Sequence, residues 1–261
     1  MIKFQSLLSS SSGNSTFITD DETAILIDCG ATGSYIESCL ARLGTDGTRL
    51  SGIFLTHAHN DHIAAAGILS RKFHLPLYAT AETFATGAKQ LGTLDPGNVR
   101  KITAGEDIKI GKLTIHAFPI PHDTEGAVSY TVSDKETKFG IATDSGHITE
   151  AILENLTGCD TVIVESNHDV KMLQDGPYPY PLKTRILGEK GHLSNDTCGA
   201  LCVRLAQNGT RAFWLGHLSD KNNLPQLAYQ CVSRTLEENG FVVGADVALN
   251  VIPKFWIEGT V

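Results

Sequence analysis

Six consecutive residues, His57-Ala58-His59-Asn60-Asp61-His62, place three imidazoles and a carboxylate side by side in the chain. The apolar run before them, residues 52–56, predicts a buried strand, and the run after them, residues 63–69, predicts the start of a helix. Imidazole nitrogens and carboxylate oxygens bind zinc and related divalent ions, and burying them without a partner is costly. The pattern therefore predicts a metal site on a strand-to-helix loop; a polar, solvated loop is the alternative.

The rest of the chain is typical of a globular protein of 261 residues with 41% hydrophobic residues. No Pro/Ser-rich linker, charge run or repeat divides it, so we expect a single domain over residues 1–261. We expect neither a signal peptide nor a membrane span, and the six cysteines contain no Cys-x-x-Cys pair, which favours buried free thiols and a cytoplasmic protein. The net charge of −8 argues against broad non-specific nucleic-acid binding but leaves room for a local basic strip.

Hydrophobic patterning predicts strands and helices in mixed order. We expect strands at 3–8, 16–19, 24–30, 52–56, 75–78, 127–132, 137–142, 161–165, 211–215 and 247–252, with a strand-turn-strand unit in 99–120. We expect helices at 33–43, 63–73, 80–91, 148–156, 182–190, 195–207 and 224–238.

A histidine or aspartate follows several of the predicted strands. Asp28, His122, Asp144 and His217 each lie at the end of an apolar run, as the 57–62 cluster does. Any one of them alone would more often be a structural residue than a ligand. Because strand ends along one sheet edge converge in space, the repeated placement indicates one shared site.

The order of these motifs resembles the metallo-β-lactamase superfamily along nearly the whole chain. The resemblance implies an α/β fold, a four-layer αββα sandwich with a dinuclear metal site at one edge. One ion would take three histidines, the other an aspartate and two histidines, with an aspartate bridging both. The implied ligands are His57, His59 and His122 for the first ion, Asp61, His62 and His217 for the second, and Asp144 for the bridge.

Two further features indicate which branch of the superfamily the chain resembles. Asp144 stands where β-lactam-hydrolysing members usually carry cysteine, which argues against that activity. The segments 10–14, 178–186, 191–195 and 217–223 resemble the YycJ (WalJ) branch, although His168 stands where that branch usually has tyrosine. The branch implies an exonuclease-like phosphodiesterase linked to DNA metabolism, with DNA as its substrate. Asp28 matches an early strand-end aspartate that orients a ligand histidine; capping the following turn is its alternative.

The implied mechanism uses two divalent ions, which activate a hydroxide held between them for attack on phosphorus. Histidine-rich ligation favours zinc, with manganese or iron as alternatives. Asp61 is expected to accept or orient a proton as well as bind metal. His192 is the residue expected to contact a phosphate or protonate the leaving oxygen, and a histidine at a helix boundary is the alternative.

The substrate residues are less strongly indicated. Ser12 and Asn14 belong to a polar loop that suits an anionic substrate or, more simply, a hairpin turn. Lys183 and Arg185, with the Tyr-Pro-Tyr-Pro segment at 178–181, suggest a wall for a nucleic-acid strand, or a solvated helix face. Ser194 suits substrate contact or a helix cap.

A second class of function stays open at this point. The same kind of two-metal site also hydrolyses cyclic phosphodiesters, thioesters or lactones, because a fold alone does not fix the substrate. The sequence leaves the oligomeric state unknown.

Overall fold

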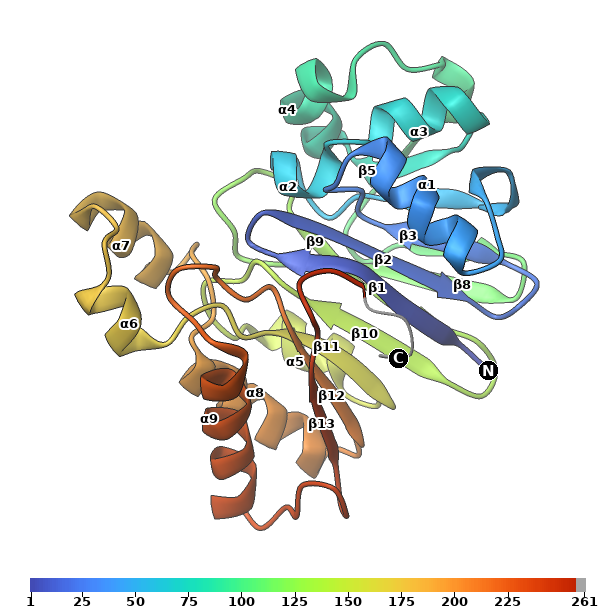
Figure 1. The fold of residues 1–261 in the computed structure, drawn as a ribbon. Helices are drawn as coiled ribbons and strands as arrows, with labels where there is room; N and C mark the ends of the chain where they lie inside the picture. The colour runs from blue at the N-terminus through green and yellow to red at the C-terminus, as the bar shows by residue number, and fades with distance from the viewer. Residues whose placement is uncertain (257–261) are drawn as a thin grey trace.

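The computed structural model describes residues 1–256, and two β-sheets packed face to face form its centre (Figure 1). The first sheet has the strand order β1-β2-β3-β4-β5-β6, and the second has the order β13-β12-β11-β10-β9-β8-β7. The strands of the first sheet are β1 (Lys3–Ser10), β2 (Gly13–Thr19), β3 (Ala24–Ile27), β4 (Gly52–Phe54), β5 (Leu77–Thr80) and β6 (Val99–Ile102). Those of the second are β7 (Asp107–Ile110), β8 (Leu113–Pro119), β9 (Val128–Ser133), β10 (Lys138–Ala142), β11 (Thr161–Glu165), β12 (Ala212–Gly216) and β13 (Ala248–Val251).

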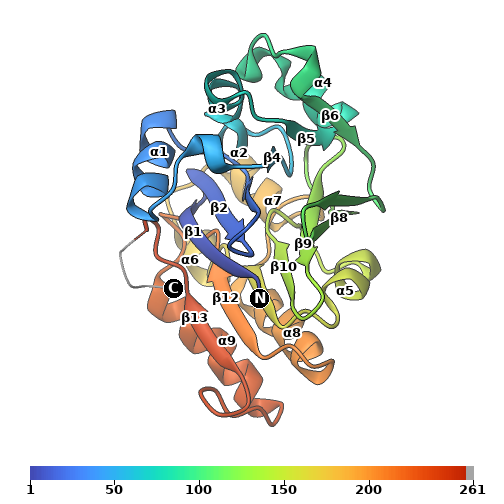
Figure 2. The same cartoon turned by 90° about the vertical axis from the view of Figure 1, so that its right-hand side faces the viewer.

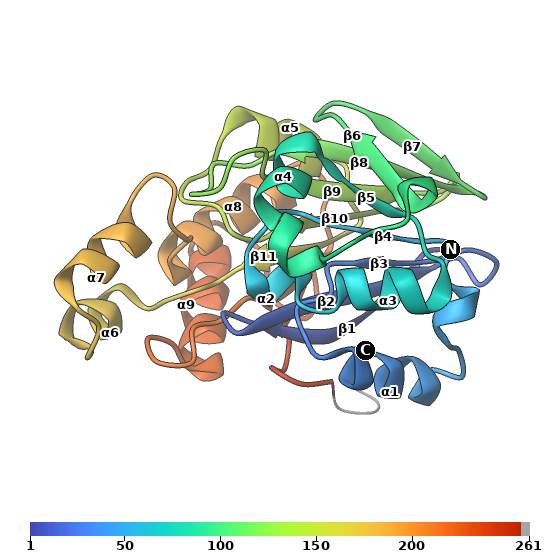
Figure 3. The same ribbon diagram turned by 90° about the horizontal axis from the view of Figure 1, so that it is seen from above.

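Helices cover the outer face of each sheet (Figures 1 and 2). The first sheet is covered by α1 (Gly33–Arg42), α3 (Ala66–Phe73) and α4 (Ala81–Leu91), with the short α2 (Asn60–Ile63) beside them. The second is covered by α5 (Glu150–Leu156), α8 (Asn195–Gln207) and α9 (Pro225–Glu238). Two further helices, α6 (Val170–Asp175) and α7 (Tyr180–Leu187), stand out from the body (Figure 3). This arrangement confirms the predicted αββα sandwich.

Three buried clusters of apolar side chains correspond to the three interfaces between the four layers. The middle cluster joins the two sheets and includes Phe54, Ile115 and Tyr130. The Tyr130 hydroxyl also donates a hydrogen bond across the interface to the carbonyl of Leu55, at 2.7 Å. Burial of each large apolar side chain contributes about 1.5–3 kcal/mol, so the sandwich is held mainly by these layers.

Parallel pairing brings the functional loops to one edge. Strands β3 to β6 run parallel to one another, as do β10 to β13. The carboxyl ends of parallel strands lie at the same sheet edge, which is where α/β proteins form their sites.

Three strand-end residues have left-handed backbone conformations: Asp28 (φ 60°), Asp144 (φ 59°) and His217 (φ 55°). This region is sparsely populated for residues other than glycine, although aspartate and histidine enter it more readily than most. The chain therefore turns sharply as it leaves β3, β10 and β12.

Several predicted element boundaries were wrong. The helix expected at 182–190 is α7, Tyr180–Leu187, because Pro181 is tolerated in a first helical turn and Gly188 caps the end. The helix expected at 63–73 is divided into α2 and α3, and α6 was not predicted. The first hairpin is tighter than expected, because pairing continues to Ser10 and Gly13.

All six cysteines are free thiols, five of them buried and Cys231 partly exposed. Within residues 1–256, no helix is long and apolar enough to span a bilayer.

Candidate active site

The first cluster of ligand atoms consists of three histidine rings that face one another. His57 and His59 come from the loop after β4, and His122 comes from the loop after β8. Nδ1 of His59 lies 3.1 Å from Nε2 of His57 and 3.2 Å from Nε2 of His122. Three nitrogens that approach this closely are arranged to share one cation.

The second cluster lies beside the first and includes Asp61, His62 and His217. Oδ2 of Asp61 lies 3.6 Å from Nε2 of His62 and 3.9 Å from Nε2 of His217. Asp144 reaches both clusters: its Oδ2 is 3.2 Å from Nε2 of His62, and its Oδ1 is 3.8 Å from Nε2 of His122. The structure therefore brings together all seven residues that the resemblance implied as ligands.

The donor set fits divalent metal ions. Four groups of side chains, drawn from these residues with Glu165 and His192, have ligand atoms within 4.8 Å of one another. Within residues 1–256, Nε2 of His217 and Oδ2 of Asp144 are buried polar atoms without a hydrogen-bond partner, and both belong to these groups. A buried polar atom that forms no hydrogen bond is costly, and a cation would satisfy both of these atoms.

Asp28 holds the outer side of the second cluster. Its Oδ2 lies 2.7 Å from Nδ1 of His62 and accepts a hydrogen bond of 2.8 Å from the Thr56 hydroxyl. That hydroxyl is 3.0 Å from Nδ1 of His57. An acceptor on Nδ1 leaves Nε2 of each ring as a free ligand atom that points inward. Asp28 therefore fixes the orientation of the His62 ring.

Glu165 contacts the Nδ1 atoms of His217 and His192 as Asp28 contacts that of His62. This role of Glu165 was not predicted from the sequence. This carboxylate is fully buried at the end of β11, and its Oε1 lies 2.6 Å from Nδ1 of His217 and 2.8 Å from Nδ1 of His192. Its Oε2 accepts hydrogen bonds from the backbone N–H groups of Leu193 and Ser145. Burial raises the pKa of Glu165, but the two histidines outweigh it and lower the pKa to about 2.

His192 lies at the rim of the site on the loop before α8. Its side chain is 18% exposed, and its Nδ1 is 3.6 Å from Oδ1 of Asp144. Burial lowers the pKa of His192, but the Glu165 carboxylate outweighs burial and raises it. The loop can approach because residue 146 is glycine: a Cβ there would lie 2.1 Å from the carbonyl oxygen of Glu189.

A third carboxylate, Asp123, was also missed. Its Oδ1 lies 3.2 Å from Nε2 of His59, the ring nitrogen opposite the Nδ1 that faces His57 and His122. Its Oδ2 accepts from Nε of Arg185, which comes from α7. Asp123 directly follows a predicted ligand, and Glu165 ends a predicted strand, so both had a sequence signal.

The residues predicted to bind substrate are dispersed. Nδ2 of Asn14 is 3.1 Å from Nε2 of His62, so this residue lies at the cluster. Ser12 is at the exposed tip of the first hairpin. Ser194 is the N-cap of α8, and its hydroxyl accepts from the N–H of Thr197 at 3.2 Å.

The two predicted basic residues on α7 both have intramolecular partners. Nζ of Lys183 donates to the carbonyl of Gln174 at 2.6 Å, and Arg185 pairs with Asp123. Both side chains lie on the projecting part of the molecule, where Tyr180 is 81% exposed.

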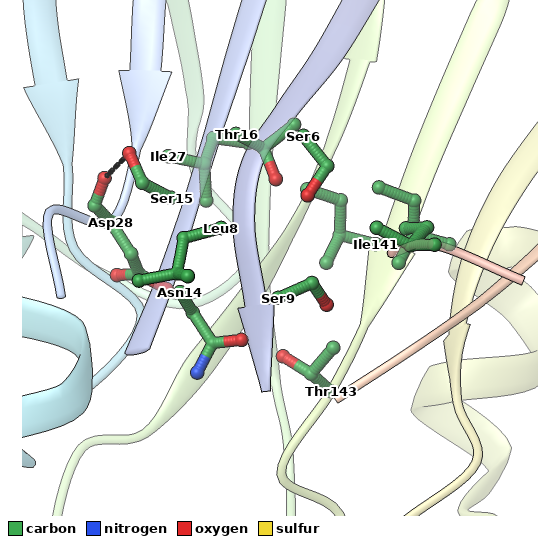
Figure 4. A pocket seen from close by; sticks show the side chains of 12 residues that line it. Ser6, Leu8, Ser9, Asn14, Ser15, Thr16, Ile27, Asp28, Ile141 and Thr143 are labelled. Atoms are coloured by element: carbon green, nitrogen blue, oxygen red, sulfur yellow. Dashed lines mark hydrogen bonds between the residues drawn. The ribbon is translucent and has the colours of Figure 1, made fainter. Parts of the chain in front are cut away.

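A small polar cavity lies behind the site, between the two sheets (Figure 4). Its volume is about 20 Å³, room for roughly one water molecule, and hydroxyl-bearing residues such as Ser6, Ser9 and Thr143 line it beside Asp28. It is too small for a substrate, which must therefore approach from the open side of the clusters.

A sandwich of this topology with histidine and aspartate ligands at its strand ends defines a metallo-hydrolase. The family model described as "Beta-lactamase superfamily domain" matches residues 23–218, and the chain belongs to that superfamily. It is an enzyme, a hydrolase of that superfamily.

Among individual relatives, the chain is 34% identical over 244 residues to "Exodeoxyribonuclease YycJ" of Bacillus anthracis, covering 93% of this chain and 92% of the relative. It is 33% identical over 246 residues to "Exodeoxyribonuclease WalJ" of Streptococcus pneumoniae, covering 94% and 91%. Among solved structures, the metallo-β-lactamase fold protein YhfI of Bacillus subtilis matches with a TM-score of 0.73 at 13% identity, covering 98% of both chains. That likeness concerns the fold alone.

Proposed function

We propose that the chain is a phosphodiesterase, a 5′–3′ exonuclease-like enzyme that cleaves DNA. We propose that it uses two divalent metal ions, and zinc is the metal that best fits the ligands. The observation that carries the proposal is the position of Asp144, whose two oxygens reach the two neighbouring clusters. The printed names of the two relatives above, both exodeoxyribonucleases, support DNA as the substrate.

The proposed ligands divide into two sets. His57, His59 and His122 would hold one ion, Asp61, His62 and His217 the other, and Asp144 would contact both. When bound, such ions lower the pKa of water and neutralise charge on phosphoryl oxygens. The remaining chemistry falls to side chains of the chain itself.

Asp61 is proposed to receive the proton of the attacking water. Burial raises the pKa of Asp61, but its contacts with His217 and His62 outweigh burial and lower it, so the carboxylate is ionised at neutral pH. Its side chain is 27% exposed, which leaves it accessible from the open side of the site. An ionised, accessible carboxylate suits a proton acceptor.

His192 is proposed to protonate the leaving oxygen of the substrate. Because Nδ1 is engaged by Glu165, Nε2 is the atom left for the substrate. The raised pKa favours the protonated ring, which can donate. Asn14 is proposed as a further contact at the cluster, and Ser12 as a contact at the exposed hairpin tip. Lys183, Arg185 and Ser194 would contact substrate only if their present partners were exchanged.

A turnover panel on the metal-loaded protein tests the proposal. It should include bis-p-nitrophenyl phosphate, single- and double-stranded DNA, a thioester and a lactone. We expect cleavage of the phosphodiesters, with mononucleotides released from DNA ends. Hydrolysis of the thioester or the lactone without phosphodiester cleavage would establish instead a small-molecule hydrolase of the same fold.

A further inference from the structure

Helices α6 and α7 form an arm, residues 170–187, that stands away from the sandwich (Figures 1 and 3). One contact of this arm reaches the site directly: Arg185 of α7 donates from Nε to Oδ2 of Asp123. Residues 123 and 185 are 62 positions apart, so the contact joins two separate segments of the chain.

The other oxygen of the same carboxylate faces the metal-ligand cluster. Oδ1 of Asp123 lies 3.2 Å from Nε2 of His59 and 3.5 Å from Nε2 of His122. A neutral imidazole has one N–H, so donation from Nε2 of His59 to Asp123 leaves Nδ1 of that ring as the lone-pair atom. Nδ1 is the atom that faces His57 and His122.

We propose that Asp123 and Arg185 are positioning residues that couple the arm to the metal centre. Arg185 fixes the carboxylate, and the carboxylate fixes the tautomer and orientation of the His59 ring. The position of α7 and the affinity of the first metal site are thereby linked. The inference rests on the proposed ligand role of His59 but not on the identity of the substrate.

The solvent exposure of the Asp123–Arg185 pair indicates that it positions the His59 ring and contributes little to the stability of the fold. The Arg185 side chain is 54% exposed and that of Asp123 is 23% exposed. Exposed ion pairs contribute little to the free energy of unfolding. In contrast, removing a carboxylate that accepts a hydrogen bond from a metal-ligating histidine typically lowers metal affinity 10- to 100-fold.

Competition between the protein and a chromophoric chelator for zinc tests the coupling. The proteins are the wild type, Asp123→Asn, Arg185→Gln and the double variant, each stripped of metal and titrated with zinc. We expect Asp123→Asn to weaken the first site about 10-fold. Arg185→Gln should weaken it by about threefold, and the double variant should be no weaker than Asp123→Asn alone.

A matched control comes from a second carboxylate–imidazole pair. Oδ1 of Asp107 lies 2.6 Å from Nδ1 of His116 on the strands β7 and β8. Asp107→Asn removes the same kind of charge and should bind zinc as the wild type does. Thermal unfolding of the metal-free variants checks that each one is folded; if Asp123→Asn is not, Arg185→Gln and Arg185→Lys decide the question.

The coupling would be overturned if Arg185→Gln bound zinc as tightly as the wild type. It would also be overturned if the loss of zinc affinity in the double variant equalled the product of the two single losses. Loss of affinity in Asp107→Asn to the same extent would also overturn it. The proposed function fails separately, on the turnover panel, because the zinc titration involves no substrate.

Discussion

Gly30 and Asp61 approach so closely that a Cβ built on residue 30 would lie 1.6 Å from the carbonyl oxygen of Asp61. The chain around Gly30 also pairs with the metal-ligand loop, since Cys29 donates to the carbonyl of His62 at 2.7 Å. The end of β3 and the His57–His62 cluster thus fit together only with glycine at this position.

We therefore predict that Gly30→Ala destabilises the protein by about 3 kcal/mol or more, because backbone must move to admit one methyl group. Denaturant unfolding measures the loss. Gly33→Ala is the control: its nearest atom would be 3.6 Å away and it begins α1, so it should be neutral or slightly stabilising. Equal stability of the two variants would contradict the prediction.

The second prediction concerns Asp144. If it contacts both metal ions, Asp144→Asn should reduce the metal content from about two ions per chain to one or fewer and abolish phosphodiester turnover. Elemental analysis after reconstitution measures the content, with Asp107→Asn as a control. A wild-type content that never exceeds one ion would exclude the dinuclear proposal.

For His192, we predict a kinetic defect without loss of metal. His192→Ala should lower kcat on DNA by about 10²- to 10⁴-fold, the usual range for a general acid. A substrate with a p-nitrophenolate leaving group needs no proton and should be affected less. Loss of metal would identify the residue as a ligand or support, and normal turnover on DNA would remove it from the chemistry.

His168 provides a prediction about pH. Burial lowers the pKa of His168 to about 4, outweighing the opposing influence of Glu165, whereas an unfolded chain has a histidine pKa near 6.5. Below about 6.5 the unfolded state binds a proton that the folded state does not, so stability falls as the pH falls. The contribution reaches about 3 kcal/mol by pH 4.

This contribution can be isolated by comparing wild type and His168→Gln, both metal-free, in denaturant unfolding at pH 7 and pH 4.5. The variant should lose less stability than the wild type between these two values. Identical losses would show that His168 titrates alike in the folded and unfolded chains.

The candidate ligands could be located in the sequence because their signals are local. His57 to His62 lie within six residues, and each of His122, Asp144 and His217 follows an apolar strand. The carboxylates of Glu165 and Asp123 could not be assigned in the same way. Glu165 meets His217 across 52 residues, and Asp123 meets Arg185 across 62, so only tertiary packing reveals these partners.

Tertiary contacts that the sequence does not reveal also affect the residues predicted to bind substrate. Lys183 and Arg185 were predicted from a basic, aromatic segment, but a sequence does not reveal that each already has an intramolecular partner. The helix was expected to begin at residue 182, directly after Pro181, but a first helical turn accommodates proline and α7 begins at Tyr180.

The proposed ligands come from both sheets: the 57–62 loop follows β4, whereas His122, Asp144 and His217 follow β8, β10 and β12. An ion held among them would fasten the two halves of the sandwich together, and its binding energy would add to that of folding. Chelation should then loosen this edge and expose the chain to proteases. The amount of intact enzyme in a cell would therefore follow the supply of metal, through turnover of the protein as well as through catalysis.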